Sequence, residues 1–134
     1  MRGKGYAGYS FNKSHGVFMS IENQQERYTP TKEDIVLAEK ILKDSIKNVL
    51  GRQKNFSTSI NLNKLKKYKR QYIGFIAKNG DVVIWINFLR DKKIEDVELS
   101  RDIIIVLDGG ERYWSIFINL TRPALYGVCI NGVS

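Results

Sequence analysis

The sequence predicts an α+β fold, in which one amphipathic helix packs on an antiparallel meander of about four to five strands. Three observations carry this prediction. Residues 29–51 space their apolar side chains as a helix does, and the second half of the chain alternates apolar and polar residues as strands do. Between two of these strand-like runs stands Asn79-Gly80. Asn-Gly there is typical of a tight hairpin turn, because both central residues of that turn need positive φ.

The start of the chain shows no sustained periodicity. We predict that residues 1–15 form a flexible N-terminal arm and that residues 16–134 form a single α+β domain. The domain is predicted to begin with a short strand over residues 16–22, in which Val17, Met19 and Ile21 share one face.

Residues 29–51 are predicted to form the helix. Thr29 or Thr31 can cap its first turn, and Gly51 is expected to end it, since glycine accepts the left-handed conformation found at many helix ends. The apolar positions follow the three-to-four spacing of one buried stripe. That stripe consists of Ile35, Ala38, Leu42, Ile46 and Val49, widened by Ile41 and Leu50.

The strands are predicted to follow the helix after a loop over residues 52–63. Two runs flank the Asn-Gly turn, and two more flank Gly109-Gly110, which predicts a second hairpin. A charged connector separates the hairpins, and a turn at residues 121–124 leads into the last strand. The predicted strands cover residues 67–78, 82–89, 102–108, 112–120 and 125–132.

Alternation divides these strands into two faces. One face is apolar and suits packing against the helix; it holds Val82, Ile84, Ile86, Phe88, Trp114, Ile116, Ile118 and Leu120. The other face mixes aromatic with polar side chains, as small-molecule pockets and protein-binding surfaces do. Its candidate binding residues are Tyr72, Trp85, Asn87, Tyr113, Ser115, Phe117 and Asn119. The alternative is a second layer of core, covered by the arm or by the loop before the strands.

This order of a helix followed by antiparallel strands resembles the cystatin-like and NTF2-like superfold over residues 16–134. The resemblance lies in the architecture. The Q-x-V-x-G loop with which cystatins block cysteine proteases is absent, and the hairpin in its place reads IAKNGDVVI. The resemblance implies a pocket-forming domain or an interaction module, and fold alone does not choose between them.

The composition argues against a disulfide-bonded protein and against a membrane-spanning one. The chain has 134 residues, a net charge of +8 and one cysteine, Cys129, which excludes an internal disulfide. No apolar run approaches the roughly 18 residues of a membrane span. The polar, glycine-rich start does not read as a signal peptide. We therefore expect a soluble protein, either cytoplasmic or exported with its leader removed.

Several sequence patterns resemble cofactor-binding, metal-binding or catalytic motifs but have a simpler structural interpretation. GKGYAG at residues 3–8 matches G-x-G-x-x-G, but no strand precedes it and no helix follows, so no cofactor is expected. His15 has no Cys, His or carboxylate cluster beside it, so neither a metal site nor a dyad with Cys129 is expected. Three carboxylates are candidates for acid–base chemistry or cation binding. Two of them flank the Gly-Gly turn, where acidic side chains are favoured because they accept hydrogen bonds from the backbone amides of the turn. The three carboxylates are Asp102, Asp108 and Glu111.

A basic run interleaved with Tyr68 and Tyr72 is the remaining motif. Lysines that neutralise phosphates beside stacking aromatics are typical of single-stranded nucleic-acid binding. The simpler interpretation is a strand whose charges face solvent and discourage aggregation at a sheet edge. The run holds Lys64, Lys66, Lys67, Lys69 and Arg70.

The leading hypothesis is a non-enzymatic binding or protein-interaction domain whose partner is a protein or a small molecule. One alternative is an NTF2-like small-molecule-binding protein or enzyme, with Asp102 or Asp108 reaching a pocket beside Tyr113 and Trp85. A second is a nucleic-acid-binding module that uses residues 64–70. A homodimer formed through the open sheet is a further expectation.

Overall fold

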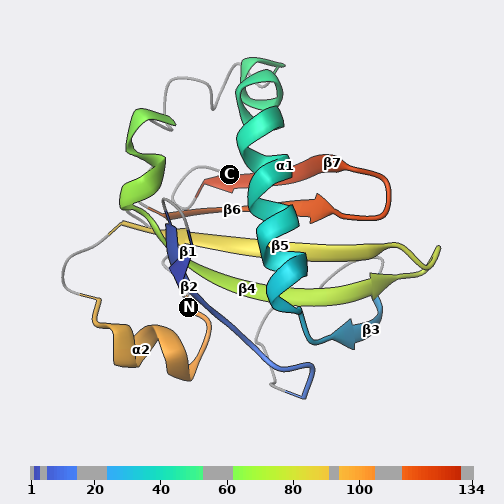
Figure 1. Cartoon of the computed structure of the whole chain (residues 1–134), viewed down its shortest axis with the longest axis horizontal. Coiled ribbons are helices and arrows are strands. Elements are labelled where there is room, and N and C mark those ends of the chain that lie inside the picture. Colours follow the sequence, from blue (N-terminus) through green and yellow to red (C-terminus); the bar gives the residue numbers. More distant parts are fainter. Residues whose placement is uncertain are drawn as a thin grey trace.

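One long helix lies across one face of a seven-stranded sheet (Figure 1). The structure is a computed structural model and describes residues 2–3, 6–14, 24–52, 62–90, 94–104 and 113–130. The α+β class predicted from the sequence is confirmed. The elements are β1 (Arg2–Gly3), β2 (Tyr6–Ser10), β3 (Gln24–Tyr28), α1 (Lys32–Arg52), the 3-10 helix η1 (Leu62–Lys67), β4 (Lys69–Ala77), β5 (Val82–Leu89), α2 (Asp96–Arg101), β6 (Tyr113–Asn119) and β7 (Ala124–Ile130).

The sheet has the order β1-β2-β4-β5-β6-β7, and β3 pairs with β4 beside β2. The pairing of β2 with β4 is parallel and every other pairing is antiparallel. β2 lies along the first half of β4 and β3 along the second half, so the two short strands share one edge of β4. At the opposite edge of the sheet, the last strand in this order is β7.

Helix α1 begins at Lys32, three residues after the predicted start, and Thr31, one of the two predicted caps, precedes it. The Thr31 hydroxyl accepts a hydrogen bond from the Asp34 amide at 3.0 Å, and the Asp34 carboxylate accepts one from the Thr31 amide at 2.9 Å. This reciprocal pair satisfies amides that a helix leaves without partners at its start. The helix runs through Gly51 to Arg52, one residue beyond its predicted end.

The main core lies between α1 and the face of the sheet that the alternation predicted to be apolar. The helix contributes Ile35, Ala38, Ile41, Leu42 and Ile46, and these pack on Ile84, Ile86, Phe88, Trp114, Ile116 and Ile118. The side chains of Val49 and Leu50 lie outside the described residues.

The hairpin between β4 and β5 is confirmed, but its loop has three residues, 78–80, where the sequence predicts a two-residue turn. Gly80 has a φ of 90°, and the Gly80 amide donates to the Ala77 carbonyl at 2.8 Å while the Ala77 amide donates to the Asp81 carbonyl at 2.8 Å. This is the pattern of a turn followed by a glycine in the left-handed conformation. The turn before the last strand is also confirmed, at residues 120–123.

Other predicted elements differ. Where the sequence predicts a flexible arm over residues 1–15, the described part of that range packs on the domain, because β1 and β2 belong to the sheet and the buried Phe11 donates its amide to the Tyr72 carbonyl at 3.0 Å. The connector before residue 102 contains α2, and η1 begins at the end of the predicted loop over residues 52–63.

The second predicted hairpin, of residues 102–108 with residues 112–120, is wrong. β6 pairs with β5 on one side and with β7 on the other, and residues 102–104 are not in a strand. The predicted strand over residues 16–22 and the Gly109-Gly110 turn lie outside the described residues.

Candidate functional site

Tyr72 does not belong to the aromatic and polar face. In the β4–β5 register Tyr72 lies opposite Ile86, and Ile73 lies opposite Trp85. Because side chains on paired residues point to the same side of the sheet, Tyr72 faces α1 and Ile73 takes the place that the sequence analysis gave to Tyr72. The Tyr72 hydroxyl donates a hydrogen bond to the Glu39 carboxylate of α1 at 2.7 Å.

Arg70 is also on the helix side, and it is buried with a counter-charge. Its guanidinium donates to both Glu39 carboxylate oxygens, from Nε at 2.9 Å and from Nη2 at 3.3 Å. Its Nη1 donates to the carbonyls of Leu65 and Tyr68 at 3.0 and 2.6 Å. Arg70 therefore holds the end of η1 against α1 and is not available to a ligand.

The other candidate residues do share one face, which we call the second face. Its middle is closed by the segment that includes α2 and residues 102–104. The buried Gln71 amide donates to the carbonyls of Leu99 and Asp102 at 3.0 and 2.7 Å, and its oxygen accepts the Ile104 amide at 3.0 Å. Asn87 donates to the Gln71 oxygen at 3.0 Å and to the Ile104 carbonyl at 2.8 Å. The polar groups of this part of the face are thus used on the chain itself.

The aromatic side chains around these amides are packed as core. Trp85 is buried with Phe11, Ile73 and Ile103. Tyr113 is buried with Leu89 and Leu99. Ser115 is buried as well. Here the second face forms a second layer of core, covered in part by Phe11, which the sequence analysis had placed in the arm.

Only the outer end of this face reaches the surface. Phe117 is half-buried, and its ring stacks on Tyr126 of β7 with centroids 5.0 Å apart and ring planes 10° apart. Tyr126 is 41% exposed and is the only exposed aromatic side chain in the part of the chain whose burial the structure describes.

Gly127 makes this stack possible. Its φ is +66°, and a Cβ at this position would lie 2.7 Å from Cδ2 of Phe117. The register advances two residues on β6, from Ser115 to Phe117, while it advances three on β7, from Cys129 to Tyr126. This is a β-bulge, and it re-aims the neighbouring side chains of an edge strand. A lone glycine in a predicted strand is the signal that could have directed attention to Tyr126.

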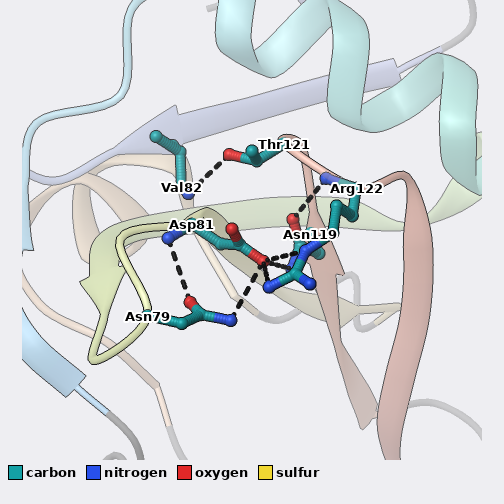
Figure 2. A network of polar contacts seen from close by, with 6 residues as sticks. All are labelled: Asn79, Asp81, Val82, Asn119, Thr121 and Arg122. Atoms are coloured by element: carbon teal, nitrogen blue, oxygen red, sulfur yellow. Dashed lines mark hydrogen bonds and ion pairs between the residues drawn. The ribbon is translucent and has the colours of Figure 1, made fainter.

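Beside the aromatic pair, Asp81 joins the two hairpin turns (Figure 2). One carboxylate oxygen of Asp81 accepts hydrogen bonds from the Asn119 amide at 2.8 Å and from Arg122 Nε at 2.9 Å, and Arg122 Nη2 lies 2.9 Å from the same oxygen. The Asn119 oxygen accepts the Arg122 backbone amide at 2.9 Å. Across the same junction, the Thr121 hydroxyl accepts the Val82 amide at 2.9 Å.

The electrostatics of this cluster favour the ionised carboxylate. The hydrogen bond from Asn119, with those from Arg122 and Asn79 and the charge of Arg122, holds the pKa of Asp81 below its usual value of 3.8, against the opposing effect of burial. Arg122 is 69% exposed although its guanidinium is anchored at one edge. Arg122 is thus an exposed, anchored cation in the turn that joins β6, which carries Phe117, to β7, which carries Tyr126. We call Phe117, Arg122 and Tyr126 the outer hairpin surface.

The basic run is divided among three environments. Lys66 and Lys67 are exposed on η1. Lys69 pairs with Asp96 of α2 at 2.7 Å, and Arg70 is buried against Glu39. Lys64 is in η1, with its side chain outside the described residues. The run is not one continuous patch along a strand.

The remaining sequence candidates add no reactive group. Asp102 accepts the Ile103 amide at 2.8 Å, and Cys129 is exposed on β7. His15, Asp108 and Glu111 lie outside the described residues. Within the described ranges no three Cys, His, Asp or Glu side chains group as metal ligands would. None of the helices in those ranges has the length and apolar character to cross a membrane.

No family model, curated protein or solved structure matches this chain. The resemblance to the cystatin-like and NTF2-like superfold therefore stays a prediction from the order of the elements.

Proposed function

We propose that this protein is a non-enzymatic protein-interaction domain that binds its partner at the outer hairpin surface. The observation that carries the proposal is Tyr126, an exposed aromatic ring stacked on Phe117 at the edge of the sheet. Aromatic and arginine side chains dominate the binding energy of protein interfaces, and this surface places both kinds side by side. The stack and the ion pair to Asp81 hold both groups in place, so little side-chain entropy is lost on binding.

The partner we propose is an acidic protein segment that carries an apolar side chain. The apolar side chain would cover Tyr126, and a carboxylate would bind the edge of the Arg122 guanidinium that faces away from Asp81. The net charge of +8 supports such a partner, because opposite net charges speed encounter and like charges oppose it. The bulge at Gly127 interrupts the edge of β7, which favours docking through side chains over the addition of a long continuous strand.

The alternative of a pocket on the second face has less support. Gln71 and Asn87 use their amide groups on residues 99–104, and Trp85 and Tyr113 pack against the covering segments. A small molecule in that place would have to displace those contacts.

A random peptide library displayed against the full chain tests the proposal. We expect the selected peptides to be acidic with one large apolar residue, and we expect Tyr126→Ala to weaken their binding, measured by isothermal titration calorimetry, by about tenfold or more. Val97→Ala on α2 is the matched control, since Val97 is also exposed and apolar but lies away from β7. Selected peptides that bind Tyr126→Ala as tightly as the wild type would contradict the proposal.

A further inference from the structure

Positive charge is concentrated in one stretch of this chain. Between Asp44 and Asp81 the sequence contains nine Lys and Arg residues and no Asp or Glu, so this stretch alone exceeds the net charge of +8 of the whole protein. The stretch covers the second half of α1, η1 and β4. The charge of the molecule is therefore unevenly distributed along its sequence.

The structure neutralises two of these cations and leaves others exposed. Arg70 pairs with Glu39, and Lys69 pairs with Asp96. Lys66 and Lys67 are exposed and form no ion pair with a described residue. These two lysines are adjacent on η1, whose end is fixed by the hydrogen bonds from Arg70 to the Leu65 and Tyr68 carbonyls.

Lys43 of α1 lies on the side of the helix that contacts Arg70. Glu39 contacts Arg70, so this side of α1 faces the end of η1, and a residue four positions later lies on the same side of a helix. That residue is Lys43, which is exposed. Leu65 of η1 packs on the core cluster that includes Leu42 and Ile46 of α1. We call Lys43, Lys66 and Lys67 the basic junction.

We propose that the basic junction binds the phosphate backbone of a nucleic acid without reading its sequence. Lysine ammonium groups are flexible point charges that neutralise phosphates and release counterions, which supplies non-specific nucleic-acid binding. Arg70 makes the backbone beneath Lys66 and Lys67 rigid, although its own charge is used internally. This second site is separate from the outer hairpin surface, and it does not depend on the proposed protein partner.

A phosphate polymer fits this junction better than a membrane surface does. Peripheral membrane binding by a helix combines lysines with apolar side chains that enter the lipid. The exposed large apolar side chains among the described residues are Val36, Leu37, Val97 and Tyr126, and none of them belongs to the junction. Three exposed carboxylates lie away from the junction, since α2 and the residue before it carry Glu95, Asp96 and Glu98 on the second face. Asp44 is exposed on α1 beside Lys43 in the sequence, so the junction keeps a net positive charge of two.

Fluorescence anisotropy of a labelled oligothymidylate with the full chain tests this proposal. For three phosphate contacts on a single strand, log K should fall with log salt with a slope of about −2. The triple variant Lys43→Gln, Lys66→Gln, Lys67→Gln should bind about tenfold or more weakly at low salt and lose most of that slope. The matched control is Lys13→Gln, Lys32→Gln, Lys78→Gln, which removes the same charge from exposed lysines elsewhere and should bind within about twofold of the wild type.

Urea unfolding of both triple variants at neutral pH checks that the fold is retained, which is expected because all six lysines are exposed. Equal weakening by the two variants would overturn the proposal, since it would show a net-charge effect without a site. Absence of binding by the wild type at low salt would overturn it too. So would competition by polyglutamate at the same charge concentration, which would indicate an acidic protein, or binding to phosphatidylserine vesicles without binding to the oligonucleotide.

Discussion

At the scale of single residues, Asp81 makes the free energy of unfolding depend on pH. Its pKa is lowered in the folded protein, chiefly by the hydrogen bond from Asn119 and further by Arg122 and Asn79. A carboxyl group whose pKa is lower in the folded than in the unfolded state stabilises the fold above its unfolded pKa, and this contribution is lost as the pH falls through the folded pKa. The free energy of unfolding should therefore decrease below about pH 4, in part because of Asp81.

We expect Asp81→Asn to remove that part of the pH dependence. The variant should be less stable than the wild type at neutral pH, and the difference between them should shrink as the pH is lowered from about 5 to about 2, measured by urea unfolding. Asp44→Asn is a suitable control, because Asp44 is exposed on α1. A difference that stays constant over this range would show that the Asp81 carboxylate is not what stabilises the junction of the two turns.

The residue scale also shows why part of the site was beyond sequence reasoning. Arg70 reads as one more cation in a basic run, and its burial depends on Glu39 of α1, which lies far away in sequence. Tyr72 was placed on the wrong face because alternation within β4 does not fix which side faces the helix; the register with β5 does. Phe117 and Asn119 were placed correctly, since their alternation within β6 could be anchored to the apolar face.

At the scale of elements, the predictable parts are those whose signal is local. The stripe of α1 repeats at helical spacing, and Gly80 marks its hairpin because the turn needs a positive φ there. β2 and β3 have no such signal. β2 is short and pairs in parallel with β4, which lies 62 residues later in the sequence (Ala7 opposite Lys69), and β3 reads QQERY, a polar sequence. The position of β2 and β3 in the sheet is set by their pairing with the edge of β4, which only the tertiary structure shows.

The attachment of α2 to the second face gives an element-scale prediction. Gln71→Leu keeps the approximate size of the side chain but leaves the Leu99 and Asp102 carbonyls and the Ile104 amide without their partner. Each buried polar group without a partner costs about 1–3 kcal/mol, so the segment should open more often. We expect hydrogen exchange at the Ile104 amide to accelerate by about tenfold or more, while exchange in the β4–β5 ladder accelerates less.

Gln25→Leu provides the control, because Gln25 is exposed on β3. If Gln71→Leu leaves exchange at Ile104 unchanged, the amide of Gln71 is not what holds the segment to the sheet. If the whole ladder exchanges as fast as Ile104, the segment does not open as a separate unit.

At the scale of the whole molecule, the two faces of the sheet are covered by different parts of the chain. The side that carries α1 holds the main core, and the second face is closed by Phe11 and the α2 segment except at its outer end. The covering of the second face therefore decides which surface is left for a partner. Because Phe11 follows directly on β2, that covering depends on the N-terminal strands being part of the fold.

Gly8 provides the test of that dependence. A Cβ at Gly8 would lie 2.6 Å from the Arg70 carbonyl oxygen and 2.8 Å from Tyr72 Cε2, so Gly8→Val must push β2 away from β4. Overpacking of this kind costs about 1–3 kcal/mol, and we expect a lower midpoint of urea unfolding. Ser10→Val adds a similar side chain at an exposed position of the same strand and should leave the free energy of unfolding within about 0.5 kcal/mol of the wild type. Deletion of residues 1–11 removes Phe11 as well and should destabilise further, with Trp85 fluorescence shifting to longer wavelength as water reaches the second face. A deletion variant as stable as the wild type would instead support the flexible arm predicted from the sequence.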